Sequence, residues 1–239
     1  RLIAGVLVDF ISWQSATYII GFINLVIACL FYLLLPKSQH FKPYPFRFSR
    51  FKAAFEQNLK DRKLRILFAE GFILMGCLVT VFNYISYHLL EAPFQLSQSW
   101  IGLISIAYLA GIYSSSKAAQ WSFKYGRAKV LPLMLLMMIA GLLITLIPAL
   151  WAILLGLIIF AFAFFAAHST ASSWVSVQAI QYRAVAASLY LFCYYIGSSL
   201  LGSSGGLIWE NFGWIGINLS VVLVLAVGLF LTFYLHDTK

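Results

Sequence analysis

The sequence predicts an all-α integral membrane protein with seven full membrane spans and part of an eighth. Of its 239 residues, 62% are hydrophobic and only 10% are charged, whereas a soluble domain carries about 25% charged residues. The apolar residues also form long blocks, and a helix needs about 20 such residues to cross ~30 Å of hydrocarbon. These blocks do not alternate apolar and polar residues as the strands of a membrane barrel do, so helices are the expected spanning elements.

The expected spans, in order, are residues 15–35, 66–90, 100–118, 130–148, 151–174, 184–206 and 215–235. Residues 1–10 are expected to be the end of an earlier span. The chain opens with Arg1 instead of Met, and Asp9 interrupts the apolar run too early for a signal peptide. We therefore interpret the start as a truncation.

Apart from Arg1, the basic residues are confined to alternate loops. The loop 36–65 holds nine of them: Lys37, Lys42, Arg47, Arg50, Lys52, Lys60, Arg62, Lys63 and Arg65. The same side also holds Lys117, Lys124, Arg127, Lys129, Arg183 and Lys239, whereas the loops 9–14, 91–99, 148–151 and 207–214 hold none. Loops rich in Lys and Arg stay in the cytoplasm, so the basic loops and the C-terminus are expected on the cytoplasmic side of a bacterial inner membrane. The net charge of +9 then reflects topology, and nucleic acid is not an expected partner.

The first forty residues are similar to a segment near the end of the chain. Three pairs match at one offset of 201 positions: Gly5 with Gly206, Asp9 with Glu210 and Trp13 with Trp214. Parallel repeats are one transporter architecture, although any two span–loop–span units share such features. With a repeat, residues 1–36 end an N-terminal half, residues 37–65 form a central cytoplasmic loop, and residues 66–239 form a C-terminal half.

Part of the central loop has the pattern of an amphipathic helix. Phe48, Phe51, Phe55 and Leu59 fall on one helical face, with basic residues around it. Such a helix would lie on the anionic inner leaflet. The alternative is a flexible basic linker.

The loop after residues 100–118 carries a recognisable motif. It reads KAAQWSFKYGRAK and resembles the gating-loop motif of the major facilitator superfamily, with Lys124, Gly126 and Arg127 at the basic, glycine and arginine positions. Ala119 and Phe123 replace the motif's first glycine and its acid. The stretches FAEGFILMG, FFAAHSTASSW and ASLYLFCYYIGSSLLG are similar to an efflux-type bacterial subgroup. The resemblance implies the C-terminal portion of a 12-helix bundle, from the end of helix five to helix twelve. It also implies alternating access by two rocking six-helix halves, often coupled to protons.

Ionisable residues inside spans are costly, and they are candidates for a substrate or proton pathway. Arg1 would bind an anionic group or form an ion pair that holds helices together. Glu70 would carry a coupling proton, or it would be an interfacial acid paired with Arg62 or Lys63. His168 would relay protons, or it would be a hydrogen-bonded packing residue.

Two spans also carry polar or small residues on defined faces. Asn83 and Tyr84, with Tyr87 and His88, are expected to form a substrate-facing wall or a set of interhelical hydrogen bonds. In span 184–206, Tyr194 shares a face with Tyr190 and Ser198 and is a further pathway candidate. Residues at four-residue intervals form a small-residue face for close helix packing, with a hinge as a compatible role. This face comprises Ser198, Gly202 and Gly206.

These features favour a secondary transporter that exports small molecules in exchange for protons. Uptake by symport stays open, as does a truncated or split half-transporter that transports nothing alone. The sequence contains no metal-ligand spacing, phosphate loop or nucleophile triad, so neither an enzyme nor any cofactor beyond the proton gradient is expected. The expected partners are the lipid bilayer, the N-terminal half of the same transporter and a small-molecule substrate of unknown identity.

Overall fold

The computed structural model describes residues 2–36 and 48–235, and every regular element within these ranges is a helix. In chain order the elements are α1 (Leu2–Phe10), α2 (Trp13–Leu34), α3 (Phe48–Lys60), α4 (Arg62–Leu90), α5 (Gln98–Leu103), η1 (Ile104–Ala107), α6 (Tyr108–Tyr125), α7 (Arg127–Ile144), α8 (Leu150–Gln178), α9 (Arg183–Thr232) and η2 (Phe233–Leu235). The expected all-helical class is confirmed.

Five of the described helices, α2, α4, α7, α8 and α9, are long and apolar enough to cross a membrane. They account for six of the seven expected spans, because 184–206 falls within α9 and 215–235 covers the end of α9 and η2. The remaining span, 100–118, corresponds to α5, η1 and α6, in which a short 3-10 segment interrupts the α-helical backbone. The chain is thus a multi-pass membrane protein.

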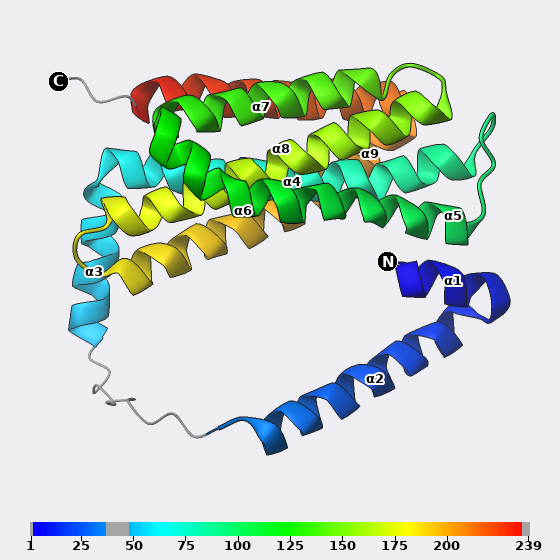
Figure 1. The fold of residues 1–239 in the computed structure, drawn as a ribbon, viewed down its shortest axis with the longest axis horizontal. Coiled ribbons are helices and arrows are strands. Elements are labelled where there is room, and N and C mark those ends of the chain that lie inside the picture. The colour runs from blue at the N-terminus through cyan, green and yellow to red at the C-terminus, as the bar shows by residue number, and fades with distance from the viewer. Residues whose placement is uncertain (1, 37–47, 236–239) are drawn as a thin grey trace.

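Helix α9 is two membrane passes joined at a sharp bend. Its 50 residues would measure about 75 Å as one rod, which is more than twice the ~30 Å of a hydrocarbon core. The backbone at Gly213 is non-helical, with φ +56° and ψ −148°, a conformation that only glycine adopts readily. Figure 1 shows α9 running along the bundle and returning from the end opposite α3.

The loops separate by charge between the two ends of the bundle. Figure 1 places α3, the α6–α7 and α8–α9 connections and the last turns of α9 toward one end, and the α1–α2, α4–α5 and α7–α8 connections toward the other. The first set contains the basic loops of the sequence and the second contains none. This segregation agrees with a positive-inside arrangement.

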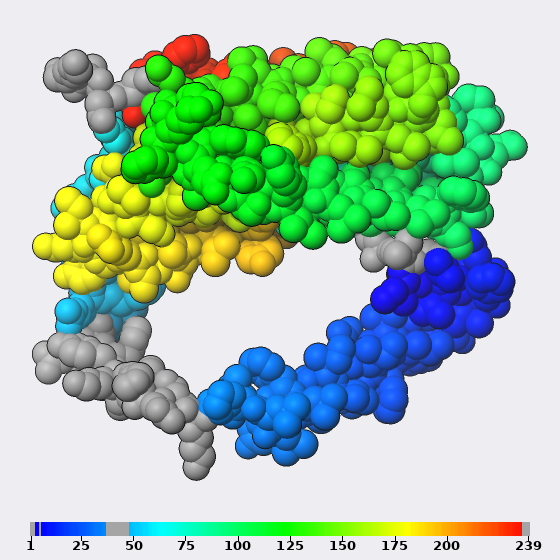
Figure 2. All heavy atoms as spheres, viewed as in Figure 1, coloured from blue at the N-terminus to red at the C-terminus, as the bar shows by residue number. Residues whose placement is uncertain are grey.

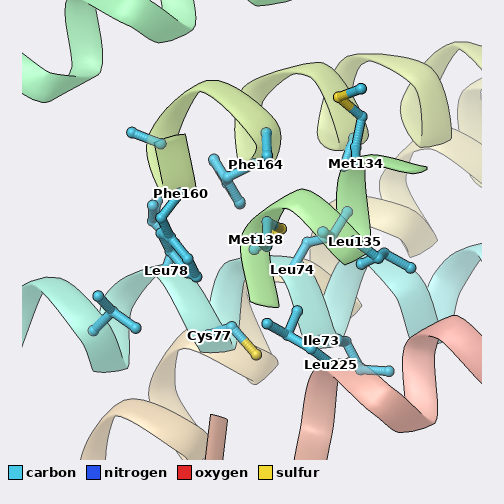
Figure 3. Close-up of a cluster of buried hydrophobic side chains, with 14 of the residues drawn as sticks. Ile73, Leu74, Cys77, Leu78, Met134, Leu135, Met138, Phe160, Phe164 and Leu225 are labelled. Atoms are coloured by element: carbon cyan, nitrogen blue, oxygen red, sulfur yellow. The ribbon is translucent and has the colours of Figure 1, made fainter. Parts of the chain in front are cut away.

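The core lies where α4, α7, α8 and α9 meet. Figure 3 shows Leu74 of α4, Met138 of α7, Phe164 of α8 and Leu225 of α9 converging, and all four are fully buried. Lipid tails are as apolar as these side chains, so close packing, not escape from water, holds helices together in a membrane.

Small residues allow α7 and α8 to approach closely. A Cβ added at Gly141 would lie 2.8 Å from the carbonyl oxygen of Gly156, so the two backbones are in contact there. Buried Asn218 ties α9 to the end of α7: in the amide orientation that satisfies its neighbours, it donates to the Leu142 carbonyl at 2.8 Å and accepts from Trp214 Nε1 at 3.0 Å.

The first two helices stand apart from this core. Along α2 only Ala16 is buried, and Figure 2 shows an opening between α2 and the rest of the molecule. Helix α1 is joined to α5 through Asp9, whose Oδ2 accepts a 2.9 Å hydrogen bond from the Ser99 backbone N–H. Hydrogen bonds from the side chain and backbone of Ser99 lower the pKa of Asp9 below its ordinary value.

Residues 48–60 form the helix α3, so the alternative of a flexible linker is wrong for this stretch. Phe48, Phe51, Phe55 and Leu59 form an exposed apolar stripe, while Ala54 packs against the bundle. Residues 37–47 of the expected central loop lie outside the described ranges. Association of α3 with the inner leaflet stays a prediction.

Candidate substrate and proton pathway

Glu70 lies inside the helical bundle, in the membrane-spanning part of α4. It is eight residues beyond Arg62, the first residue of α4, or about 12 Å along the helix axis. Its side chain is fully buried, and neither carboxyl oxygen has a hydrogen-bond partner within the described residues. A Cβ added at Gly228 would lie 3.2 Å from Glu70 Oε2, so α9 packs directly on the carboxyl group. An ionised carboxylate without a partner would be very costly in such a place.

The expectation that Glu70 is an interfacial acid paired with Arg62 or Lys63 is wrong. Asp61 is the acid at the start of α4, where its Oδ1 accepts hydrogen bonds from two backbone N–H groups of the first turn, at 2.8 and 3.1 Å. The Arg62 guanidinium lies 4.6 Å from the ring centroid of Tyr234. Within the described residues, no cation forms a salt bridge with Glu70.

A histidine–tyrosine pair joins α8 and α9 near this acid. His168 Nδ1 lies 3.0 Å from the hydroxyl oxygen of Tyr190, within hydrogen-bond distance. The imidazole also stacks on Phe164, with planes 6° apart, and its centroid lies 4.8 Å from that of Tyr194. A buried polar group needs such a partner. The expectation of a hydrogen-bonded packing histidine is therefore confirmed, and a proton-relay role stays a prediction.

Tyr190 is the residue that places this pair beside Glu70. It is nearly fully buried, and a Cβ added at Gly71 would lie 2.8 Å from its ring. The ring therefore rests on the α4 backbone one residue from Glu70. Sequence reasoning placed Tyr190 on one face with Tyr194 but did not select it as a pathway residue. The four-residue spacing of Tyr190 and Tyr194 could be seen in the sequence. The sequence did not show which side chains of α4 and α8 face Tyr190 across the helix interface.

A second polar region lies at the other end of α4, around a cavity of about 750 Å³. Residues from α1, α4, α5, η1 and α9 line this outer cavity, including Asn83, Tyr84 and Gly206. The Tyr84 hydroxyl donates a 3.0 Å hydrogen bond to the Gly202 carbonyl oxygen, which fixes the ring against α9. An interhelical hydrogen bond is thus confirmed for Tyr84, which also lines the cavity, and a substrate-facing role stays a prediction.

Not all of the expected polar stretch faces the cavity. Tyr87 lines it, whereas His88 stacks on Trp214, with centroids 5.6 Å apart and planes 11° apart. Glu70 and Tyr84 are 14 residues apart on α4, or about 21 Å. The candidates therefore form two separate regions along one helix.

The small-residue face of α9 is offset from the one expected. Gly197 contacts the Phe72 carbonyl so closely that an added Cβ would overlap it, and Gly205 approaches the Tyr84 ring in the same way. Of the expected three residues, Gly202 faces α4, where an added Cβ would lie 3.0 Å from Val79. Ser198 donates to the Tyr195 carbonyl of its own helix, and Gly206 lines the outer cavity.

The expected gating loop is the turn between α6 and α7. Gly126 has φ +86°, which favours glycine, and it is the single residue between the last residue of α6 and the first residue of α7. The Lys124 ammonium lies 5.0 Å from the Tyr125 ring centroid, and Arg127 is half-buried with its Nε unpartnered in the described part of the chain. The gating role stays a prediction. Arg1 lies outside the described residues.

Comparison with known proteins decides the family. A family model described as Major Facilitator Superfamily matches residues 1–202. The chain belongs to the major facilitator superfamily. It is 45% identical to the inner membrane transport protein YnfM of Escherichia coli. This similarity extends over 236 residues, which are 99% of this chain and 57% of that protein. It is 40% identical over 235 residues to the MFS-type transporter YybF of Bacillus subtilis, covering 98% of this chain and 58% of that protein.

A transporter of Buchnera aphidicola from Schizaphis graminum is also similar, with 45% identity over 232 residues, 97% of this chain and 56% of that protein. The chain therefore spans less than two thirds of the length of the curated relatives that it matches. Membership of this superfamily, with relatives named as transporters, supports a role in membrane transport.

Proposed function

We propose that this superfamily chain works as part of a secondary active transporter that exchanges protons for a small molecule by alternating access, in the direction of export. The observation that carries the proton coupling is Glu70. It is a fully buried carboxyl group without a hydrogen-bond partner in the described residues, in a helix that spans the membrane. Such a group is stable there when protonated, and it can lose its proton only when the helices around it move or admit water.

The contacts around Glu70 support this coupling. Gly228 of α9 closes over the carboxyl group, and Tyr190 packs beside it on Gly71. Tyr190 belongs to the first pass of α9 and Gly228 to the second, so a shift of either pass against α4 would change the exposure of Glu70. The Tyr190 hydroxyl in turn reaches His168 of α8. A motion that opens this interface is thus linked to protonation of the carboxyl group.

The test compares two kinds of transport by the full-length protein in proteoliposomes. With Glu70→Gln, we expect uphill movement driven by a pH gradient to be lost for every compound that the wild type moves. Exchange of the same compound between two pools without a gradient should persist, because the amide mimics the protonated acid. Glu56→Gln is the matched control, because Glu56 is an exposed acid whose single ion pair among the described residues is with Lys52, at 3.9 Å.

Wild-type gradient-driven transport by Glu70→Gln would refute the coupling role. Everted vesicles with an acidic lumen separate export from uptake: antiport in the export direction fills the lumen with substrate, whereas symport in the uptake direction does not. If the wild type moves nothing from a broad panel of compounds, the transporter proposal itself fails.

A further inference from the structure

We infer that the outer cavity recognises the cationic group of its ligand, an organic ammonium held against an aromatic wall with Glu210 as the counter-charge. This inference rests on the proposed transport function and names a chemical feature of the substrate. The cavity measures about 750 Å³, within the range of about 300–1,000 Å³ typical of sites for small organic ligands. It lies between α1, α4, α5 and α9, toward the end of Figure 1 where α1 and α5 meet.

The wall consists of three aromatic side chains that all line the cavity, Tyr84 and Tyr87 of α4 and Trp209 of α9. Their ring centroids lie 6.0 to 6.1 Å from one another. Tyr84 is held in place by its hydrogen bond to the Gly202 carbonyl. Aromatic rings attract cations through their π electrons, tryptophan most strongly, and groups of such rings bind quaternary ammonium ligands.

Charge in and around the cavity has one sign in the described part of the chain. Among the described residues that line the cavity, Glu210 is the only Asp, Glu, Lys, Arg or His. It follows Trp209 directly and lies one helical turn beyond Gly206, which shares the lining face. Glu210 forms no salt bridge with any described residue. Its carboxylate is therefore available to a cation that rests on the neighbouring rings.

The wider surroundings reinforce this sign. Asp9 and Glu91 lie at the same end of the bundle, and the loops there contain no Lys or Arg. Hydrogen bonds from Ser99 lower the pKa of Asp9, so it is ionised at neutral pH. Clefts lined by one sign of charge concentrate ligands of the opposite sign. The competing expectation is an anion site at Arg1, which lies outside the described residues and precedes the lining residue Ala4 by three positions in the sequence.

The test uses two probes that share a benzyl group and differ in charge, benzyltrimethylammonium and benzylsulfonate. Equilibrium dialysis against the full-length protein in detergent should show tighter binding of the ammonium by about tenfold or more. Trp209→Leu and Glu210→Gln should each weaken ammonium binding, by about 2- to 30-fold, the range expected of a cation–π contact or a partly screened charge. Trp209→Phe keeps an aromatic ring and should retain most of the affinity for the ammonium. This result would show that a substitution at Trp209 leaves the site folded.

Two control variants lie outside the cavity. Trp151→Leu removes an exposed tryptophan at the start of α8, and Glu56→Gln removes an exposed acid of α3 that is distant from the lining residues. Neither should change the affinity. Equal or tighter binding of the sulfonate would overturn the inference, as would ammonium binding that is unaffected by both Trp209→Leu and Glu210→Gln. Sulfonate binding that is abolished by Arg1→Gln would establish the anion site instead.

This measurement is independent of proton coupling, because it requires no gradient. A cation site with the expected variant pattern in a protein that moves nothing would refute only the transport proposal. Gradient-driven transport of uncharged or anionic compounds, without ammonium binding, would refute only the cation site.

Discussion

Replacing Glu70 by methionine should stabilise the protein while it abolishes coupled transport. The two side chains are similar in volume, and methionine has no polar atom to bury. Both oxygens of Glu70 are enclosed without a hydrogen-bond partner in the described residues, and each such group costs about 1–3 kcal/mol. Allowing for partial relaxation, we expect Glu70→Met to raise the free energy of unfolding by about 2 kcal/mol. For a domain of this size that corresponds to a rise in Tm of roughly 4–8 °C.

The assay is thermal unfolding in detergent, followed through the reaction of the buried Cys77 thiol with a fluorogenic maleimide after the other cysteines are replaced by serine. Glu56→Met serves as the control, because this exposed i,i+4 pair with Lys52 contributes about 0.5 kcal/mol at most. An unchanged or lower Tm for Glu70→Met would show that the carboxyl group has a stabilising partner, and it would refute the reasoning. A stabilised variant without coupled transport would mark Glu70 as retained for function at the expense of stability.

Two further predictions concern helix contacts. Gly197→Ala should destabilise the protein by about 1–3 kcal/mol, because its methyl group would overlap the Phe72 carbonyl and a backbone atom cannot turn aside; Gly206→Ala, which has room for a methyl group, should leave the Tm nearly unchanged. A similar Tm loss in both variants would contradict this contact. Asp9→Asn should loosen α1 from α5 at neutral pH, because the carboxylate accepts from Ser99. Since hydrogen bonding lowers the pKa of Asp9, the wild-type contact should persist at neutral pH and weaken only in acid, as the pH falls through this lowered pKa. The distribution of distances between spin labels on α2 and α7 measures the effect of Asp9→Asn and the effect of low pH. A distribution that neither change alters would count against the contact between Asp9 and Ser99.

Only some residues of the candidate sites could be predicted from the sequence. Glu70, His168, Asn83 and Tyr84 were selected because polar residues in apolar spans are costly, and the structure places them in the bundle interior or at the outer cavity. Tyr190 was not selected, because its importance comes from the residue across the helix interface. The glycine face was displaced for a similar reason: a four-residue spacing identifies a face but not which neighbouring helix it meets.

The sequence by itself determined the solvent, the helical class and the separation of charge between two ends. Hydrophobic length and loop charge are sums over neighbouring residues, so they can be read before any contact is known. Only the tertiary structure decided that α9 folds back at Gly213, that Glu70 has no partner in the described residues, and that Tyr84, Tyr87 and Trp209 share one wall with Glu210. Each of these depends on which faces of separate helices meet, and in lipid that choice follows from close packing of specific side chains, not from hydrophobicity.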